Sequence, residues 1–194
     1  MRIGEIKRKT AETDIVVKVN IDGSGKRDIK TGVGFFDHVL ESFTKHGLFD
    51  IDAFCKGDTW VDAHHSVEDV GIALGEAFLA AMGDKKGIRR FAHSILPMDE
   101  ALVMASVDIS GRPYIAYDID FRDPTTGGFD ACLLEEFLRA FAFGAKVTLH
   151  VKKLAGTNTH HIIECAMKAV ARAMMDALTI DPRVTGVPST KGSL

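Results

Sequence analysis

The sequence is poor in cysteine, and its three cysteines follow no recognised spacing. Cys55, Cys132 and Cys165 lie far apart in the chain and form no C-x-x-C pair. An odd number of widely spaced cysteines argues against both a disulfide framework and a thiolate zinc site. We therefore expect all three to be buried as small apolar residues.

Long apolar runs and an excess of positive charge are also absent. No apolar run approaches the roughly 18 residues that a membrane-spanning helix needs, and the charged start MRIGEIKRKT lacks the apolar segment of a signal peptide. The formal net charge is −3 at pH 7, so the chain has no basic field for binding nucleic acid or an anionic membrane. These absences predict a cytoplasmic protein with no nucleic-acid or membrane partner.

The rest of the composition is that of a globular protein with an internal repeat. The chain has 194 residues, of which 46% are hydrophobic and 26% charged. Glu12–Gly23 (ETDIVVKVNIDG) and Glu100–Gly111 (EALVMASVDISG) share a glutamate, a strand-like stretch and a turn glycine. Further along, the helix-like segment Phe35–Phe43 aligns with Leu133–Phe141. Similar offsets over consecutive elements indicate a duplication with changes in loop length.

The repeat predicts the fold class. We expect one domain, residues 1–194, made of two repeats of about 1–92 and 93–182 and a C-terminal tail, 183–194. Each repeat would contain strands, a helix, further extended segments and a second helix, with Thr59–Asp62 extended and the second helices at His64–Gly83 and His160–Leu178. This order predicts an α+β fold of duplicated halves with pseudo-twofold symmetry, in which helices pack on one face of each sheet.

The motif His-His-x-x-Glu occurs twice, at His64–Glu68 and at His160–Glu164. In a helix, residues i and i+4 lie on the same face, so the first histidine and the glutamate of each motif can bind one metal ion. The middle histidines, His65 and His161, are rotated by about 100° from their neighbours. Each would therefore reach a different ion held by the other motif, and two motifs predict two metal ions.

Alignment of the repeats adds one ligand to each motif. His38 in the first repeat aligns with Glu136 in the second, and both residue types bind metals. One ion would be held by His38, His65, His160 and Glu164, and the other by His64, Glu68, Glu136 and His161. Imidazole and carboxylate ligands without thiolate suit manganese, iron or zinc, and open coordination positions would favour catalysis.

Longer segments around these motifs resemble the imidazoleglycerol-phosphate dehydratase family. They are GFFDHVLESFTKHG at Gly34–Gly47, HHSVEDVGIALGEAF at His64–Phe78 and NTHHIIECAMKA at Asn158–Ala169, supported by the shorter segments KGIRRF, PMDEAL, SGRPY and PSTKGSL. The resemblance covers essentially the whole chain. Two departures are Ala63, where the family often has an acidic residue, and Glu136, where some members have histidine.

The resemblance implies a fold, a reaction and a cofactor. The fold would be that of the ribosomal protein S5 domain 2-like proteins. The reaction would be the manganese-dependent loss of water from D-erythro-1-(imidazol-4-yl)glycerol 3-phosphate to give 3-(imidazol-4-yl)-2-oxopropyl phosphate, a step of histidine biosynthesis. Two Mn²⁺ ions would serve each active site. The chain would form a homo-oligomer, a 24-mer built from trimers, with its sites at subunit interfaces.

The resemblance also implies residue roles. Glu12 matches the position of a substrate-contacting glutamate and is the candidate acid or base. Cationic and hydroxyl side chains would bind the phosphate. The residues implied to contact substrate are Glu12, His38, His46, His64, His65, Glu68, Arg90, Arg112, His160, His161, Lys168, Ser189, Thr190 and Lys191.

Two other classes of protein could use the same metal ligands. A dinuclear metallohydrolase would hold a bridging hydroxide and release phosphate or a carboxylate, whereas a dehydratase yields a ketone. A metal-storage or metal-organised assembly protein would show no turnover with an imidazole phosphate.

Overall fold

The computed structural model describes residues 1–194 and divides into two halves of similar content. The first half contains β1 (Ile3–Lys9), β2 (Thr13–Asn20), β3 (Arg27–Lys30), α1 (Gly34–Gly47), β4 (Asp50–Gly57) and α2 (His64–Met82). The second half contains β5 (Phe91–Met98), β6 (Ala101–Asp108), β7 (Tyr114–Asp118), β8 (Thr125–Thr126), β9 (Phe129–Asp130), α3 (Leu133–Ala145), β10 (Thr148–Ala155) and α4 (Thr159–Leu178).

The two four-stranded sheets have the same topology. Their strand orders are β1-β2-β4-β3 and β5-β6-β10-β7, and β8 and β9 form a separate hairpin. In each sheet the last pair, β4 with β3 or β10 with β7, is parallel, and the other pairs are antiparallel. Apart from the β8–β9 hairpin, each element of the second half has a counterpart at the same place in the first half. The predicted duplicated α+β fold is therefore confirmed.

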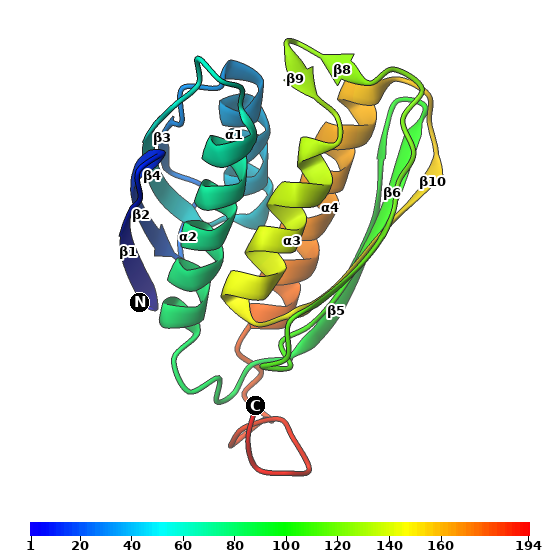
Figure 1. Ribbon diagram of the computed structural model, residues 1–194. Coiled ribbons are helices and arrows are strands. Elements are labelled where there is room, and N and C mark those ends of the chain that lie inside the picture. The colour runs from blue at the N-terminus through cyan, green and yellow to red at the C-terminus, as the bar shows by residue number, and fades with distance from the viewer.

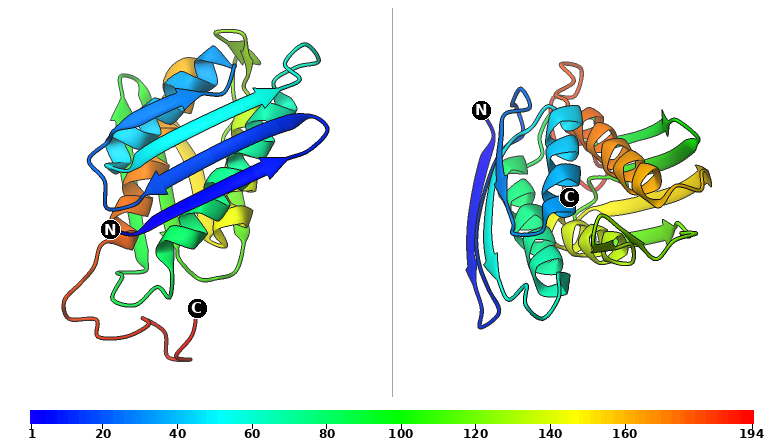
Figure 2. Two further views of the ribbon diagram at one scale, coloured as in Figure 1. Left: turned by 90° about the vertical axis from the view of Figure 1, so that its left-hand side faces the viewer. Right: turned by 90° about the horizontal axis from the view of Figure 1, so that it is seen from above.

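The four helices lie between the two sheets (Figures 1 and 2). Helix α2 packs on β1 and β2, and α4 packs on β5 and β6, so helices cover one face of each sheet as predicted. Across the middle of the molecule α1 packs against α4, and α2 against α3. All four helices begin at the same end of the molecule, the upper end in Figure 1.

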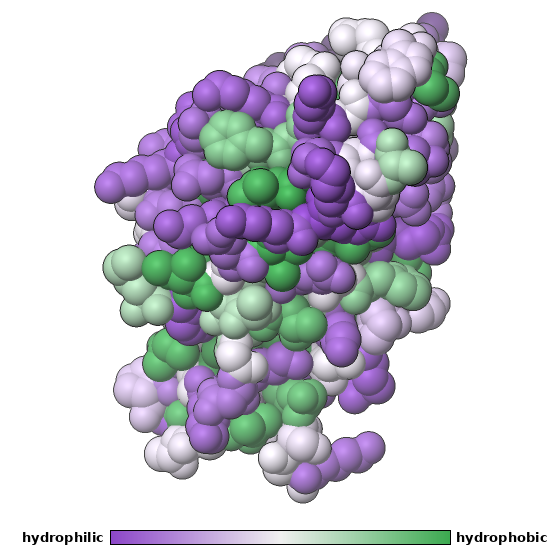
Figure 3. All heavy atoms as spheres, turned by 60° about the vertical axis from the view of Figure 1, so that its left-hand side comes forward, coloured by the Kyte–Doolittle hydropathy of each residue, from purple (hydrophilic) through white to green (hydrophobic).

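The strand sequences explain the position of the core. Along β2, buried Ile15, Val17 and Val19 alternate with outward-facing residues, the period of two expected for a sheet with one buried face. Figure 3 views the molecule from the side of the first sheet, where polar side chains cover much of the surface. The apolar residues of both sheets face the helices and join them in one continuous hydrophobic core.

Helices α2 and α3 approach closely because small residues line their contact. A Cβ added to Gly75 would lie against the carbonyl oxygen of Phe141 and 2.7 Å from the backbone nitrogen of Ala145. The reverse holds for Gly144, where a Cβ would lie 2.7 Å from the carbonyl oxygen of Ile72. The backbones of the two helices thus leave no room for a side chain at these positions.

We expect Gly75→Ala to destabilise the protein by at least about 1–3 kcal/mol, because the added methyl group forces α2 and α3 apart. The shift of the urea unfolding midpoint measures this effect. Gly34→Ala is the matched control, since an added Cβ there meets nothing within 4 Å. Equal midpoints for both variants would contradict the close packing.

Two local expectations from the sequence were wrong. Thr59–Asp62 is a turn, in which the Val61 amide donates to the Asp58 carbonyl at 2.9 Å, and is not an extended segment. Of the cysteines, Cys165 is buried, but Cys55 is only partly buried and Cys132 is exposed.

No helix combines the length and apolar character required to cross a membrane.

Candidate active site

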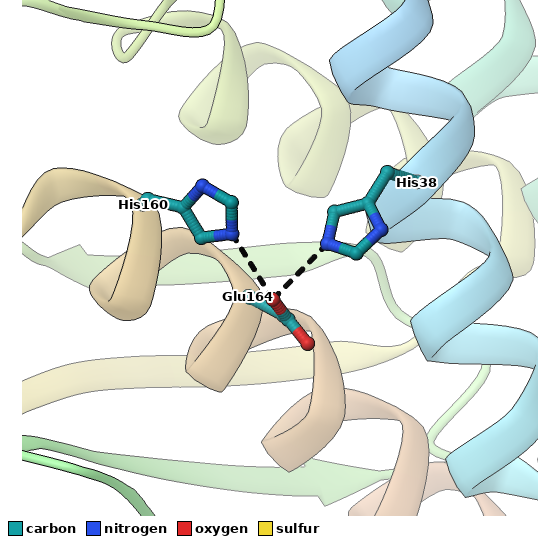
Figure 4. Close-up of side chains that lie close together, drawn as sticks. All are labelled: His38, His160 and Glu164. Atoms are coloured by element: carbon teal, nitrogen blue, oxygen red, sulfur yellow. Dashed lines mark hydrogen bonds and ion pairs between the residues drawn. The ribbon is translucent and has the colours of Figure 1, made fainter.

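The first set of metal-binding side chains joins α1 to α4. His38, His160 and Glu164 each offer a donor atom, and these atoms lie within 4.8 Å of one another. The Oε2 atom of Glu164 is 3.1 Å from His38 Nε2 and 3.3 Å from His160 Nε2 (Figure 4). The i, i+4 spacing in α4 brings His160 and Glu164 together, and the packing of α1 on α4 adds His38.

Glu164 is the anionic centre of this set. Its residue is 8% exposed, and burial alone would raise the pKa of its carboxyl group. Hydrogen bonds from Lys168 and His38 outweigh that effect and lower the pKa to about 2. The Lys168 ammonium lies 2.7 Å from Oε1, the oxygen turned away from His160. Glu164 is therefore ionised at neutral pH and can bind a cation without losing a proton.

The second set joins α2 to α3 in the same way. His64, Glu68 and Glu136 offer donor atoms within 4.8 Å of one another. His64 Nε2 lies 3.9 Å from Glu68 Oε2, and both side chains are 44% exposed. Glu136 occupies in α3 the place that His38 occupies in α1. The duplication therefore yields two pseudo-symmetric sets, and the proximity expected of His38 and Glu136 to their respective motifs is observed.

Each set fits a divalent transition-metal ion. Metal–ligand bonds of about 2.1 Å place neighbouring ligands about 3 Å apart, close to the separations in the first set. The donors are imidazole nitrogens and carboxylate oxygens without thiolate, which suits manganese, iron or zinc. Three protein donors in one chain leave positions for further ligands on each ion.

The middle histidines do not join these sets within one chain. His65 Nδ1 lies 3.0 Å from Asp58 Oδ2, and its Nε2 lies 3.7 Å from Glu12 Oε1. His161 Nδ1 lies 2.8 Å from Glu100 Oε2, and its Nε2 lies 3.7 Å from Asp99 Oδ2. One chain therefore supplies three of the four ligands predicted for each ion, and the crossed pairing of His65 and His161 stays a prediction.

Carboxylates hold both middle histidines. The Asp58 hydrogen bond raises the pKa of His65 above its ordinary value, despite an opposing contribution from desolvation. In the second repeat, hydrogen bonds from His161 and from the Asn158 backbone lower the pKa of Glu100 to about 2. Asp58 and Glu100 had no predicted role, because neither has a helical spacing from its histidine: Asp58 lies between β4 and α2, and Glu100 directly precedes β6.

Glu12, the predicted acid or base, lies in the turn between β1 and β2. Its side chain is half exposed, and its Oε1 atom lies 3.7 Å from His65 Nε2. The hydroxyl oxygen of Thr10 accepts a hydrogen bond from the Glu12 backbone amide, which fixes the turn. The candidate proton-transfer group thus lies beside one predicted ligand, with its carboxylate open to an incoming molecule.

A second stripe of polar side chains follows the contact between α1 and α4 away from the metal set. His46 lies two helical turns beyond His38, and Lys168 two turns beyond His160. Burial and the neighbouring Lys168 charge lower the pKa of His46, although the Glu164 carboxylate opposes them. Ser42, whose hydroxyl lies 3.5 Å from Glu164 Oε1, was not predicted, although its i+4 spacing from His38 marks it.

The remaining predicted phosphate ligands lie at the opposite end of the helices. Arg90 binds Asp108 at 2.7 Å and donates to the Pro188 carbonyl at 2.9 Å, which ties it to the tail that carries Ser189, Thr190 and Lys191. Arg112 is exposed, 4.0 Å from the same Asp108. The Arg90 amide donates to the Ala177 carbonyl. At about 1.5 Å per residue, α4 spans about 20 Å from Glu164 to Ala177, so this group does not meet the metal sets within one chain.

Sequence comparison gives a consistent set of relatives. The family model described as imidazoleglycerol-phosphate dehydratase matches residues 31–174. The chain is 59% identical to the imidazoleglycerol-phosphate dehydratase of Caldanaerobacter subterraneus over 194 residues, which is 100% of both chains. It is 58% identical to that of Acetivibrio thermocellus over 190 residues, 98% of this chain and 97% of the relative.

Solved structures show the same similarity. The crystal structure of imidazoleglycerol-phosphate dehydratase from Staphylococcus aureus matches with a TM-score of 0.84 and 37% identity, covering 92% of this chain and 99% of that one. The enzyme from Pyrococcus furiosus matches with a TM-score of 0.84 and 39% identity, covering 97% of this chain and 100% of that one.

Proposed function

Because the chain belongs to the imidazoleglycerol-phosphate dehydratase family and is a dehydratase of histidine biosynthesis, we propose that it works with two Mn²⁺ ions per active site, each completed by a second copy of the chain. One observation carries the proposal. Each metal set in one chain has three donors. Beside each set lies one further histidine, His65 or His161, whose Nδ1 contacts a carboxylate and whose Nε2 does not reach the set.

The placement of the ligands supports a paired contact. Helix α4 carries two ligands of the first set together with His161, and α2 carries two ligands of the second set together with His65. If the start of α2 in one copy meets the start of α4 in another, His65 completes the first set while His161 completes the second. Such a head-to-tail contact forms a ring when the rotation between neighbouring copies closes. By resemblance, we propose trimers that assemble into a 24-mer.

Exposed apolar side chains beside the second set support a protein contact there. Trp60 and Val61 lie in the turn before α2, and their exposed fractions are 84% and 61%. Large apolar side chains of this kind at one place on a surface are typical of interaction sites. Their position next to His64 puts the expected contact at the metal ligands.

The residues of the chain divide the work of dehydration. When bound, the two ions would act as Lewis acids towards the substrate imidazole. His38, His64, Glu68, Glu136, His160 and Glu164 would hold the ions, joined by His65 and His161 of neighbouring copies. Glu12 would move the proton at the substrate carbon, since its half-exposed carboxylate lies beside His65. Lys168 and His46, along the α1–α4 stripe, would extend the site towards the phosphate.

The phosphate would also be bound by residues of another copy. Five predicted phosphate ligands lie near the C-terminal end of α4, too far from the metal sets of their own chain to reach them. They are Arg90, Arg112, Ser189, Thr190 and Lys191. Guanidinium and ammonium groups are the usual phosphate ligands. A neighbouring copy that brings its tail to the site would cover the bound substrate and exclude water.

Metal removal tests the proposal. We expect protein stripped by a chelator to lose turnover of imidazoleglycerol phosphate and to dissociate to smaller species, because the metal sites join copies. Adding Mn²⁺ should restore both ketone formation and oligomer size, followed in parallel by absorbance in base and by light scattering. The stripped protein with Mg²⁺ is the control. Full activity without metal, or activity restored without assembly, would contradict the proposal.

Single histidine variants test the crossed pairing. We expect His64→Ala and His65→Ala each to lower the affinity for one Mn²⁺ ion per chain. The two variants should affect different ions, since the two side chains belong to opposite sets. Titration of Mn²⁺ into His64→Ala, His65→Ala and the corresponding double variant measures this. The double variant should lose both tight ions. If it retains as many ions as each single variant, both histidines bind the same ion.

A further inference from the structure

Glu12 and Glu100 are equivalent in the duplicated fold, but they contact different atoms. Each directly precedes the second strand of its repeat, β2 or β6. Glu100 accepts a hydrogen bond at 2.8 Å from His161 Nδ1 and another at 2.8 Å from the backbone amide of Asn158. Glu12 makes no contact with the Nδ1 atom of its histidine and instead lies 3.7 Å from His65 Nε2.

In the first repeat a different carboxylate holds Nδ1. Asp58 follows β4 and is 8% exposed, and its two oxygens lie 3.0 and 3.2 Å from His65 Nδ1. The equivalent residue after β10 is Gly156, with φ +119°, where an added Cβ would lie 2.8 Å from Ala101 Cα. No side chain fits at this place in the second repeat. Each repeat therefore has one carboxylate on Nδ1, provided from two different positions.

We infer that Asp58 and Glu100 are positioning residues that hold Nδ1 of His65 and His161, so that each Nε2 is presented to a metal ion bound by another copy. A carboxylate behind a ligating imidazole fixes the tautomer and orientation of the ring and increases its basicity. The inference rests on the proposed function. It also explains the difference between the repeats: because Asp58 holds His65, Glu12 is left for proton transfer.

Substitutions of the two equivalent glutamates should therefore have different effects on Mn²⁺ binding. We expect Glu100→Ala and Asp58→Ala each to weaken one of the Mn²⁺ ions bound per chain by about 10–100-fold, the usual effect of losing a carboxylate behind a metal ligand. Glu12→Gln should bind both ions with wild-type affinity and assemble normally. Equilibrium dialysis of the full-length protein against Mn²⁺, followed by elemental analysis, measures the bound metal without reference to activity.

Conservative and control variants separate positioning from folding. Glu100→Gln keeps an acceptor for Nδ1–H, so its Mn²⁺ affinity should lie between those of the wild type and Glu100→Ala. Asp14→Ala removes an exposed carboxylate that pairs only with Lys9, and it should change nothing. Circular dichroism checks the fold of every variant. In metal-free protein, ¹⁵N NMR should find the proton of His161 on Nδ1 in the wild type.

The outcomes distinguish this inference from the proposed function. If the wild type binds two Mn²⁺ ions and Glu100→Ala and Asp58→Ala bind them as tightly, the positioning role is wrong and the dehydratase proposal stands. If Glu12→Gln loses metal as Glu100→Ala does, the division of roles between the glutamates is wrong. If the wild type binds no Mn²⁺, both proposals fail.

Discussion

Replacing Glu12 by glutamine is expected to lower kcat by about 10²–10⁴-fold, the contribution of a positioned acid or base. The amide has the shape of the carboxylate but cannot accept or return the proton. Nothing in the fold depends on the Glu12 charge, because the turn is fixed through its backbone amide and Thr10. Metal content and assembly should therefore stay at wild-type values.

Steady-state rates of ketone formation measure this effect. Asp14→Asn is the matched control, since it neutralises a carboxylate two residues away that faces Lys9 and not His65. We expect the control to keep its kcat and the Glu12→Gln variant to keep its KM within a few-fold. A Glu12→Gln enzyme with the kcat of the control would exclude Glu12 as the proton-transfer group.

Glu164→Ala is expected to remove one metal ion from each active site and with it nearly all turnover. Glu164 is the shared neighbour of His38 and His160 and the partner of Lys168, whose side chain is 19% exposed. Its loss leaves that ammonium without its buried anion, and the charge then repels a cation at the site. The loss of Mn²⁺ affinity should exceed the roughly 10–100-fold that follows loss of a residue behind a ligand.

Glu135→Ala is the control for Glu164→Ala. Glu135 is also a helical glutamate with a cationic partner four residues on, Arg139, but it lies outside both metal sets. Its substitution should cost little, as is usual for an exposed ion pair. Bound metal per chain and kcat should both fall in Glu164→Ala alone. Wild-type metal content in Glu164→Ala would show that the first set does not hold an ion.

The sequence was sufficient to predict the duplicated fold because its signals are local and repeated. The strand before Gly23 and the strand before Gly111 have matching patterns, and the two helices that begin with paired histidines end as expected. The turn at Thr59–Asp62 was missed because Thr, Trp and Val favour strands. Local hydrogen bonds fix the turn: the Val61 amide donates to the Asp58 backbone carbonyl, and the His64 amide donates to Asp62 Oδ1 at 2.7 Å.

The candidate site was predictable only where ligands share a helix or a repeat position. Residues i and i+4 in α2 and α4 were identified by spacing, and His38 and Glu136 by alignment of the repeats. The carboxylates behind His65 and His161 were not, because Asp58 and Glu100 reach those histidines through the sheet and turn geometry of each half. Hydrogen bonds made by residues outside the helices, such as these two, leave no periodic signal in a sequence.

Mixing two inactive variants tests most directly whether each site is shared between copies. Glu164→Ala damages the α4 side of a site and His65→Ala damages the α2 side. When metal-free subunits of the two are mixed in equal amounts and reassembled with Mn²⁺, about a quarter of the sites should combine two intact sides and regain activity, as random pairing in a symmetric oligomer requires. A mixture with no more activity than either variant alone would contradict sites built between chains.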